Sequence, residues 1–167
     1  MQKIIIQEQV SRLRPLTPSA PKAERLPTVT VVYEDAAALK WAQEECKRMF
    51  VGPCWVRIQS TWWKLDSLSD PPVLAGAVSK AMRADLIVVA IRATEGFPLP
   101  FYVWVGSWLP HRLHGEGKLV ALIATPKPHG FHRNRAAECL RSVAQRAGMR
   151  FQVKERNLGL EALDGWE

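Results

Sequence analysis

Strand-like and helix-like patterns alternate along most of this chain, and that alternation constrains its fold more than any other feature. Runs rich in β-branched, aliphatic or aromatic residues occur at 28–33, 54–65, 85–91, 119–124 and 150–153. Between these runs, apolar residues recur every three or four positions, as they do along the buried face of a helix. The helical patterns lie at 39–49, 71–82, 101–108 and 136–147. A βαβαβαβαβ order predicts a parallel sheet with helices on both faces.

Right-handed crossovers between parallel strands leave few arrangements for five strands. We therefore predict an α/β fold, a three-layer α/β/α sandwich around a five-stranded parallel sheet in the flavodoxin-like order 2-1-3-4-5. This domain is expected to span residues 28–157. Residues 1–27 contain four prolines among scattered arginines and lysines, so we expect a flexible basic tail there. Residues 158–167 are expected to form a short C-terminal extension.

Sheets of this order bind ligands beyond the carboxyl ends of their strands, near the switch between the first and third strands. The loops expected there are 33–36, 92–99 and 125–133. The first loop contains Glu34 and Asp35 and no Gly, Ser or Thr, so its charge would repel a phosphate. No G-x-G-x-x-G, P-loop or G-x-S-x-G motif occurs in the sequence. We therefore predict no flavin mononucleotide, no dinucleotide and no other cofactor.

Single residues at the strand ends resemble those of response-regulator receiver domains. The resemblance covers most of the predicted domain. Glu34 and Asp35 follow the first strand, Thr125 ends the fourth, and Lys154 ends the fifth. In receivers, residues of these types surround an aspartate that ends the third strand and accepts a phosphoryl group. Here that position falls at Ala90–Ile91, which cannot accept phosphate. The resemblance implies a degenerate receiver-like domain that takes no part in phosphorelay.

The function predicted from this resemblance is a non-catalytic receiver-like module with a regulatory or protein-interaction role, and we lean away from an enzyme. The Leu99-Pro100 pair and the helix carrying Trp104 and Trp108 also resemble bacterial proteins of uncharacterised function, which implies the fold and no activity. Trp62 and Trp63 are adjacent on a predicted edge strand, so they should point to opposite faces. Because tryptophan is enriched in interfaces, this pair is the candidate surface for a homodimer or a protein partner.

The formal net charge is +7, and it is concentrated in the tail and in residues 111–156. The candidate anion-binding residues precede or open the last helix, whose N-terminus favours anions; they are Lys127, His129, His132 and Arg133. One alternative function is therefore small-anion or nucleotide binding by the 125–133 loop. A second alternative is nucleic-acid binding through the basic tail and the last helix. An ordinary solvated surface would carry the same charges.

Neither of two H-x-x-H pairs predicts a metal site. These pairs, His111–His114 and His129–His132, have no cysteine or acid placed nearby to complete a metal shell. Three cysteines without a C-x-x-C motif fit a reducing compartment. No apolar stretch approaches the ~18 residues of a membrane span, and the Ile4–Ile6 run is shorter than the apolar core of a signal peptide. We expect a cytoplasmic protein that does not contact membranes.

Overall fold

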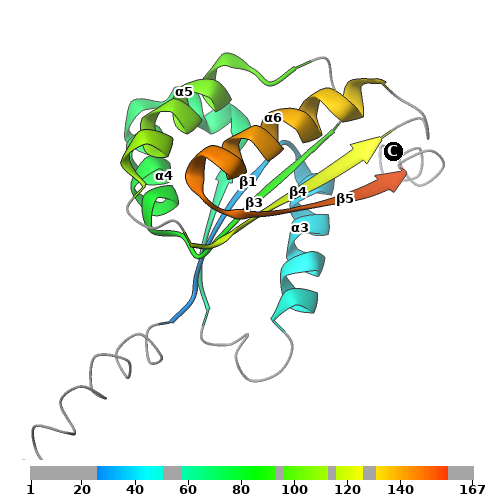
Figure 1. Cartoon of the computed structure of the whole chain (residues 1–167), viewed down its shortest axis with the longest axis horizontal. Coiled ribbons are helices and arrows are strands. Elements are labelled where there is room, and N and C mark those ends of the chain that lie inside the picture. Colours follow the sequence, from blue (N-terminus) through cyan, green and yellow to red (C-terminus); the bar gives the residue numbers. More distant parts are fainter. Residues whose placement is uncertain (1–25, 51–57, 93–95, 113–115, 126–130, 158–167) are drawn as a thin grey trace, which may run out of the picture.

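A computed structural model describes residues 26–50, 58–92, 96–112, 116–125 and 131–157, with the backbone alone described at 131–134 and 157. Nearly all of the predicted tail, and all of the predicted C-terminal extension, lie outside these residues. The described part contains one sheet and the helices that pack on it, shown in Figure 1.

The order of elements follows the predicted alternation. The strands are β1 (Thr28–Tyr33), β2 (Gln59–Lys64), β3 (Leu86–Arg92), β4 (Lys118–Thr125) and β5 (Arg150–Asn157). The α-helices are α3 (Ala36–Met49), α4 (Pro71–Arg83), α5 (Leu99–Trp108) and α6 (Phe131–Ala147). Two 3₁₀ turns, η2 (Leu65–Ser69) and η3 (Leu109–His111), follow β2 and α5. All strand pairs are parallel in the order β2-β1-β3-β4-β5, which confirms the predicted fold class.

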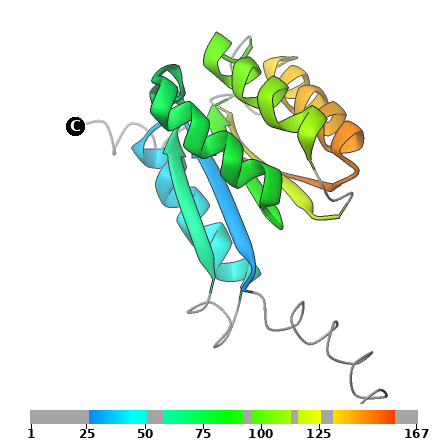
Figure 2. The ribbon, with the colours of Figure 1, turned by 90° about the vertical axis from the view of Figure 1, so that its left-hand side faces the viewer.

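The helices divide unequally between the two faces of the sheet. Helix α3 covers one face, while α4, α5 and α6 form a layer on the other (Figures 1 and 2). Alternate residues of the central strands pack to opposite sides, as strand geometry requires. Val31 and Val88 pack in the cluster under α3, whereas Val32 and Val89 pack in the cluster under the three other helices. Strands buried on both faces explain the nearly continuous apolar runs in the sequence.

Helix α6 is followed by a glycine in the left-handed backbone conformation. Gly148 has a φ of 70°, a conformation that residues with a Cβ adopt at a cost. The chain then reverses, and the N–H of Met149 donates to the carbonyl of Ala144 at 2.8 Å. This hydrogen bond satisfies one of the last helical carbonyls and directs the chain into β5.

None of the described helices combines the length and the apolar character that crossing a bilayer requires.

Strand β5 is longer than its sequence pattern indicates. The apolar pattern stops at Val153, but the strand continues to Asn157. Phe151 and Val153 pack on the core beneath α6, so the alternate residues of the strand face the side covered by α3. On that side the strand carries charged residues, so the second half of β5 has no apolar pattern in the sequence.

Candidate functional site

Two acids and an arginine meet where the strand order reverses, at the edge formed by the carboxyl ends of β1 and β3. Glu34 and Asp35 make the two-residue turn between β1 and α3, and Arg92 ends β3. The Arg92 Nε lies 2.7 Å from Asp35 Oδ2. The backbone N–H of Arg92 donates to Glu34 Oε2 at 2.6 Å, and that of Glu34 donates to the Ala90 carbonyl at 3.0 Å. These contacts fasten the acidic turn to β3.

Asp35 also caps the helix that it precedes. Its Oδ1 accepts a hydrogen bond from the N–H of Ala38 at 2.8 Å, so one donor of the first turn is satisfied from within the chain. The N-terminus of a helix carries a partial positive charge and is a favourable place for an anion. Here the carboxylate of Asp35 is that anion, and Arg92 neutralises it from the other side.

An aromatic cluster of Phe97, Phe101 and Tyr102 lies at the beginning of α5, which follows β3. Phe97 stacks on Phe101 with ring centroids 4.0 Å apart. The Tyr102 ring meets both in edge-on geometry, with centroid separations of 6.1 and 5.9 Å. Phe101 is fully buried, whereas Tyr102 is 47% exposed. A Cβ placed on Gly96 would lie 3.9 Å from the Tyr102 hydroxyl, so this hydroxyl lies near Gly96.

The structure does not bring together all four residues of the predicted receiver-like cluster. Glu34 and Asp35 lie at the carboxyl edge, and Thr125 is buried at the end of β4. In the sheet register, however, Thr125 pairs with Asn157, while Lys154 pairs with Leu122. Because β5 extends beyond Val153, Lys154 lies three residues short of the edge. Its Nζ donates to Glu45 of α3 at 2.6 Å.

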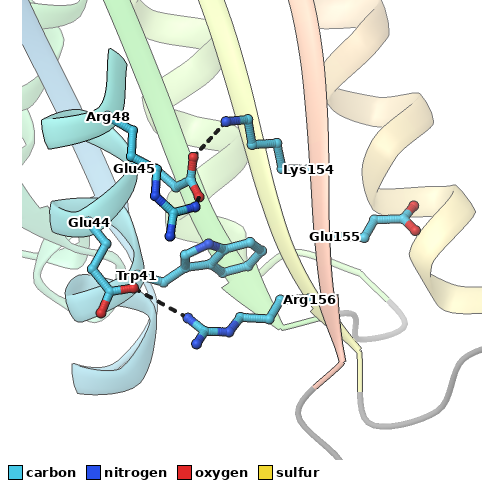
Figure 3. Close-up of a pocket in the computed structure, with 7 residues that line it drawn as sticks. All are labelled: Trp41, Glu44, Glu45, Arg48, Lys154, Glu155 and Arg156. Atoms are coloured by element: carbon cyan, nitrogen blue, oxygen red, sulfur yellow. Dashed lines mark hydrogen bonds and ion pairs between the residues drawn. The ribbon is translucent and has the colours of Figure 1, made fainter. Parts of the chain in front are cut away.

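A groove of about 500 Å³ separates α3 from β5 on that face of the sheet (Figure 3). Its lining residues are Trp41, Glu44, Glu45, Arg48, Lys154, Glu155 and Arg156. The carboxylate of Glu45 is 5% exposed and also lies 3.1 Å from Arg48 Nη1. Burial raises the pKa of Glu45, but the hydrogen bond and charge of Lys154, helped by a hydrogen bond from Trp41 and the charge of Arg48, outweigh burial and lower this pKa below its ordinary value.

The outer part of the groove is also crossed by charged side chains. Arg156 places its guanidinium carbon 6.0 Å from the centre of the Trp41 ring, and its Nη1 lies 3.5 Å from Glu44 Oε2. Figure 3 shows Arg156 and Lys154 reaching from β5 toward α3. The pairs Lys154–Glu45 and Arg156–Glu44 therefore link the edge strand β5 to the only helix on this face among the described residues. Sequence analysis missed Glu45 because its partner lies 109 positions away.

The tryptophan pair lies on the edge strand β2 and points to opposite faces, as predicted. Trp62 packs against the cluster under α3, and Trp63 packs against the cluster on the other face. Each indole N–H donates to a hydroxyl two residues earlier, Trp62 to Ser60 at 3.0 Å and Trp63 to Thr61 at 3.1 Å. A role for this pair in a dimer or partner interface stays a prediction.

The candidate anion-binding residues lie mostly outside the described part of the chain. Lys127 and His129 are beyond it, and His132 and Arg133 are described only as backbone in the first turn of α6. Anion binding by this loop stays a prediction, and so does nucleic-acid binding by the tail and last helix. Within the residues that the structure describes, no group of three His, Cys, Asp or Glu side chains could hold a metal ion.

Comparison with known proteins identifies the fold. No protein-family model and no curated protein sequence matches this chain. Among solved structures, a short-chain flavodoxin associated with a bacterial microcompartment is similar over 83% of this chain and 90% of its own, with a TM-score of 0.56 and 16% identity. An NADH:FMN oxidoreductase in its apo form covers 83% and 79%, with a TM-score of 0.60 and 14% identity. A flavodoxin from Streptococcus pneumoniae covers 82% and 90%, with a TM-score of 0.54 and 11% identity.

These similarities define the chain as a protein of flavodoxin-like fold, and at such identities they establish the fold alone. They contradict the predicted function, because the similar structures are flavodoxins and an FMN oxidoreductase and not regulatory receivers. The interpretation as a non-catalytic receiver-like regulatory or protein-interaction module was wrong, and the leaning away from an enzyme has lost its basis. Acids, threonine and lysine at strand ends occur in many parallel sheets, and Lys154 does not belong to the carboxyl edge at all.

The residues at the β1–α3 turn do not fit the phosphate of FMN. A phosphate at the N-terminus of α3 would have to displace the carboxylate of Asp35 from the N–H of Ala38. It would also meet the charge of Glu34, while Arg92 is engaged by Asp35 at 2.7 Å. Two carboxylates and one arginine leave a net negative charge at the turn, which opposes a phosphate dianion.

Proposed function

We propose that this chain binds a planar aromatic ligand of the flavin type at the carboxyl edge of β1 and β3, by its ring and not by a phosphate. The observation that carries the proposal is the half-exposed Tyr102 ring on the aromatic cluster at the start of α5. Aromatic rings stack favourably on planar heterocycles, and this contact needs no charged group. Proteins of this fold bind ligands at the same edge, beside the switch between the first and third strands.

The similar structures support a redox role for such a ligand. One of them is named as an NADH:FMN oxidoreductase and two as flavodoxins. Flavins carry the electron chemistry themselves, and the protein supplies binding and orientation. On this proposal Tyr102 orients the ring, while the pairing of Asp35 with Arg92 keeps the neighbouring turn closed to a phosphate. A cytoplasmic location remains part of the proposal. The free thiols of Cys46 and Cys139 are compatible with a reducing compartment.

Comparing riboflavin with FMN tests the proposal, because the two differ only in the phosphate. Quenching of flavin fluorescence by the full chain should give dissociation constants within about threefold of each other, since the phosphate gains no partner at this turn. Tyr102→Ala should weaken binding of both flavins by about tenfold, the equivalent of one stacking contact. Val103→Ala is the matched control, because Val103 is the next exposed residue of α5 and takes no part in the aromatic cluster.

Two outcomes would overturn the proposal. If FMN binds about thirtyfold more tightly than riboflavin, the protein recognises the phosphate and our account of the turn fails. If neither flavin binds at concentrations up to the solubility limit of riboflavin, the proposed function fails as a whole.

A further inference from the structure

Backbone hydrogen bonds join the amino ends of neighbouring strands into one edge of the sheet, opposite to the edge of the proposed ligand site. The N–H of Asp85 donates to the Thr28 carbonyl at 2.9 Å, and that of Lys118 donates to the Asp85 carbonyl at 3.0 Å. The N–H of Arg150 donates to the Gly117 carbonyl at 3.0 Å. All strands run in parallel, so each helix between two strands runs back to this edge and ends there (Figure 1). We call the strand beginnings and the helix ends together the amino edge.

The positive charge of the protein is concentrated at the amino edge. The last turns of α3, α4 and α6 contain no acid and five bases, which are Lys47, Arg48, Lys80, Arg83 and Arg146. Lys118 and Arg150 begin β4 and β5, and Arg112 follows η3. The acids at this edge, within the described part of the chain, are Asp85 and Glu116. Eight bases against two acids leave a surplus of six, which nearly equals the net charge of +7 of the whole chain.

Most of these bases are available to a partner. Five of them are exposed and have no ion-pair partner among the residues that the structure describes; they are Lys47, Lys80, Arg83, Arg146 and Arg150. Arg112 differs, because its guanidinium donates to the carbonyls of Ala81 and Ala84 at 2.8 and 2.7 Å. These bonds satisfy the end of α4 and fix one more positive charge at the amino edge.

Helix dipoles explain only part of this charge. A cation in the last turn of a helix stabilises the partial negative charge there, and α3, α4 and α6 all have such cations. Lys118 and Arg150 begin strands, however, and strands have only small net dipoles. Helix α6 ends with Arg146 in its last turn but has no acid in its first turn, where the dipole would favour one equally. The surplus therefore indicates a partner of opposite charge.

The absence of exposed apolar side chains at this edge indicates the kind of partner. Among the described residues, the exposed large apolar side chains are Leu99, Tyr102 and Val103, which lie on α5 and not at the amino edge. Protein interfaces have an apolar and aromatic core from which charge is depleted, and single-stranded nucleic acids stack their bases on aromatic rings. Double-stranded nucleic acid instead presents rows of phosphates and is bound by charge alone.

The size of the amino edge fits a duplex. Five strands about 4.8 Å apart make an edge about 19 Å wide, which corresponds to about five or six nucleotide steps of about 3.4 Å along one strand of a duplex. The exposed bases come from helices on both faces of the sheet and from β5, so they are spread along this edge and not gathered at one point.

We propose that the amino edge binds the phosphate backbone of double-stranded nucleic acid without reading its base sequence. The partner is that of one alternative predicted from the sequence, but its place differs. Of the last helix only the final turn takes part, together with the ends of α3 and α4 and the beginnings of β4 and β5. The proposed ligand site lies at the opposite edge of the sheet, so this inference does not depend on the proposed function.

Fluorescence anisotropy of a labelled 20-base-pair DNA duplex, titrated with the full chain between about 50 and 200 mM salt, tests the proposal. Five phosphate contacts predict that the logarithm of the association constant falls against the logarithm of the salt concentration with a slope of about −4.5. Arg146→Gln together with Arg150→Gln removes two contacts. The slope should then become shallower by about 1.8, and the affinity at about 50 mM salt should fall by at least about tenfold.

Lys40→Gln together with Lys64→Gln is the matched control. Both lysines are exposed and lie away from the amino edge, Lys40 in the first half of α3 and Lys64 at the carboxyl end of β2. This variant changes the net charge by the same amount and should leave the slope unchanged. Two duplexes of unrelated sequence should bind within about threefold of each other, and a single strand of either sequence should bind more weakly.

Four results would overturn the proposal. The first is no binding of either duplex at about 50 mM salt. The second is a slope that Arg146→Gln with Arg150→Gln leaves unchanged, since the phosphates would then be bound elsewhere in the chain. The third is an equal loss of affinity in the control variant, which would make net charge alone the cause. The fourth is tighter binding to vesicles that contain phosphatidylserine than to the duplexes, which would assign the amino edge to a lipid surface.

Discussion

Lys154→Met should destabilise the fold most where Glu45 is charged. The change removes the 2.6 Å hydrogen bond from Lys154 and leaves the Glu45 carboxylate, which is 5% exposed, with Trp41 and Arg48 as its remaining partners. Breaking a buried ion pair costs about 3–5 kcal/mol when both groups are fully enclosed. Lys154 is 32% exposed, so water can partly replace it, and we expect about 2 kcal/mol at pH 7.

The pH dependence of this loss follows from the pKa of Glu45. In the intact protein this pKa is lowered, so folding favours the carboxylate; that stabilisation is present at pH 7 and disappears as the pH falls through the lowered pKa. Without Lys154, burial raises the pKa of Glu45 and only the hydrogen bond from Trp41 and the charge of Arg48, which is 72% exposed, oppose it. Protonation then relieves the buried charge, so the difference between the two proteins should shrink at acid pH.

Urea unfolding at pH 7 and at about pH 4, near the ordinary Glu pKa, measures both effects. At neutral pH the midpoint should fall by about 1 M, given slopes of about 1–3 kcal/mol per molar urea. Adding Glu45→Gln to Lys154→Met should restore part of the stability, because no charge is then left in the groove at that position. Arg141→Met is the control: it removes a solvent-exposed pair with Glu138 and a contact with the Phe151 ring at 5.6 Å, which together should cost under about 1 kcal/mol at either pH. A loss from Lys154→Met that does not change with pH would refute the reasoning.

Three further predictions concern single residues. Asp35→Ala removes the cap of α3 and the partner of Arg92, and should lower the free energy of unfolding by about 1–2 kcal/mol, whereas Asp35→Asn, which keeps a capping oxygen, should lose less. Gly106→Ala should raise the stability of the monomer by about 0.5–1 kcal/mol in thermal or urea unfolding at low protein concentration; a loss would mean that the position is not open. Burial and the charge of Glu45 raise the pKa of Cys46 to about 11. Alkylation at pH 8 followed by peptide mass spectrometry should therefore find Cys46 unmodified until urea unfolds the chain. Modification under native conditions would contradict its burial.

The parts of the fold that the sequence predicts correctly are those with a local signal. The central strands are buried on both faces, so their apolar runs mark them clearly, and β3 is buried from Leu86 to Ile91. The same logic predicts where the carboxyl edge lies and that its first turn is acidic. It does not show that Asp35 caps α3 or that Arg92 neutralises it, because a carboxylate in a turn looks the same in sequence whether it is free or bound.

The errors arise where structure depends on distant partners. Lys154 follows an apolar run, so its position resembles a strand end, but the charged residues after Val153 extend β5 along a face that α3 covers. The pairing with Glu45 links residues 109 positions apart, and no local pattern reports it. Receiver-like and flavin-binding proteins share strand order, so the function could not follow from the alternation alone.

The carboxylate at the start of α3 has a consequence for the protein in its ligand-free state. A turn that must wait for a phosphate leaves its amide groups to water until the ligand arrives, and the ligand then orders it. Here the amide of Ala38 already has an acceptor within the chain. Hydrogen exchange at this amide should therefore be slow in the ligand-free protein and should change little when a ring binds. The turn is preorganised, so none of the binding free energy of a ligand is used to fold it.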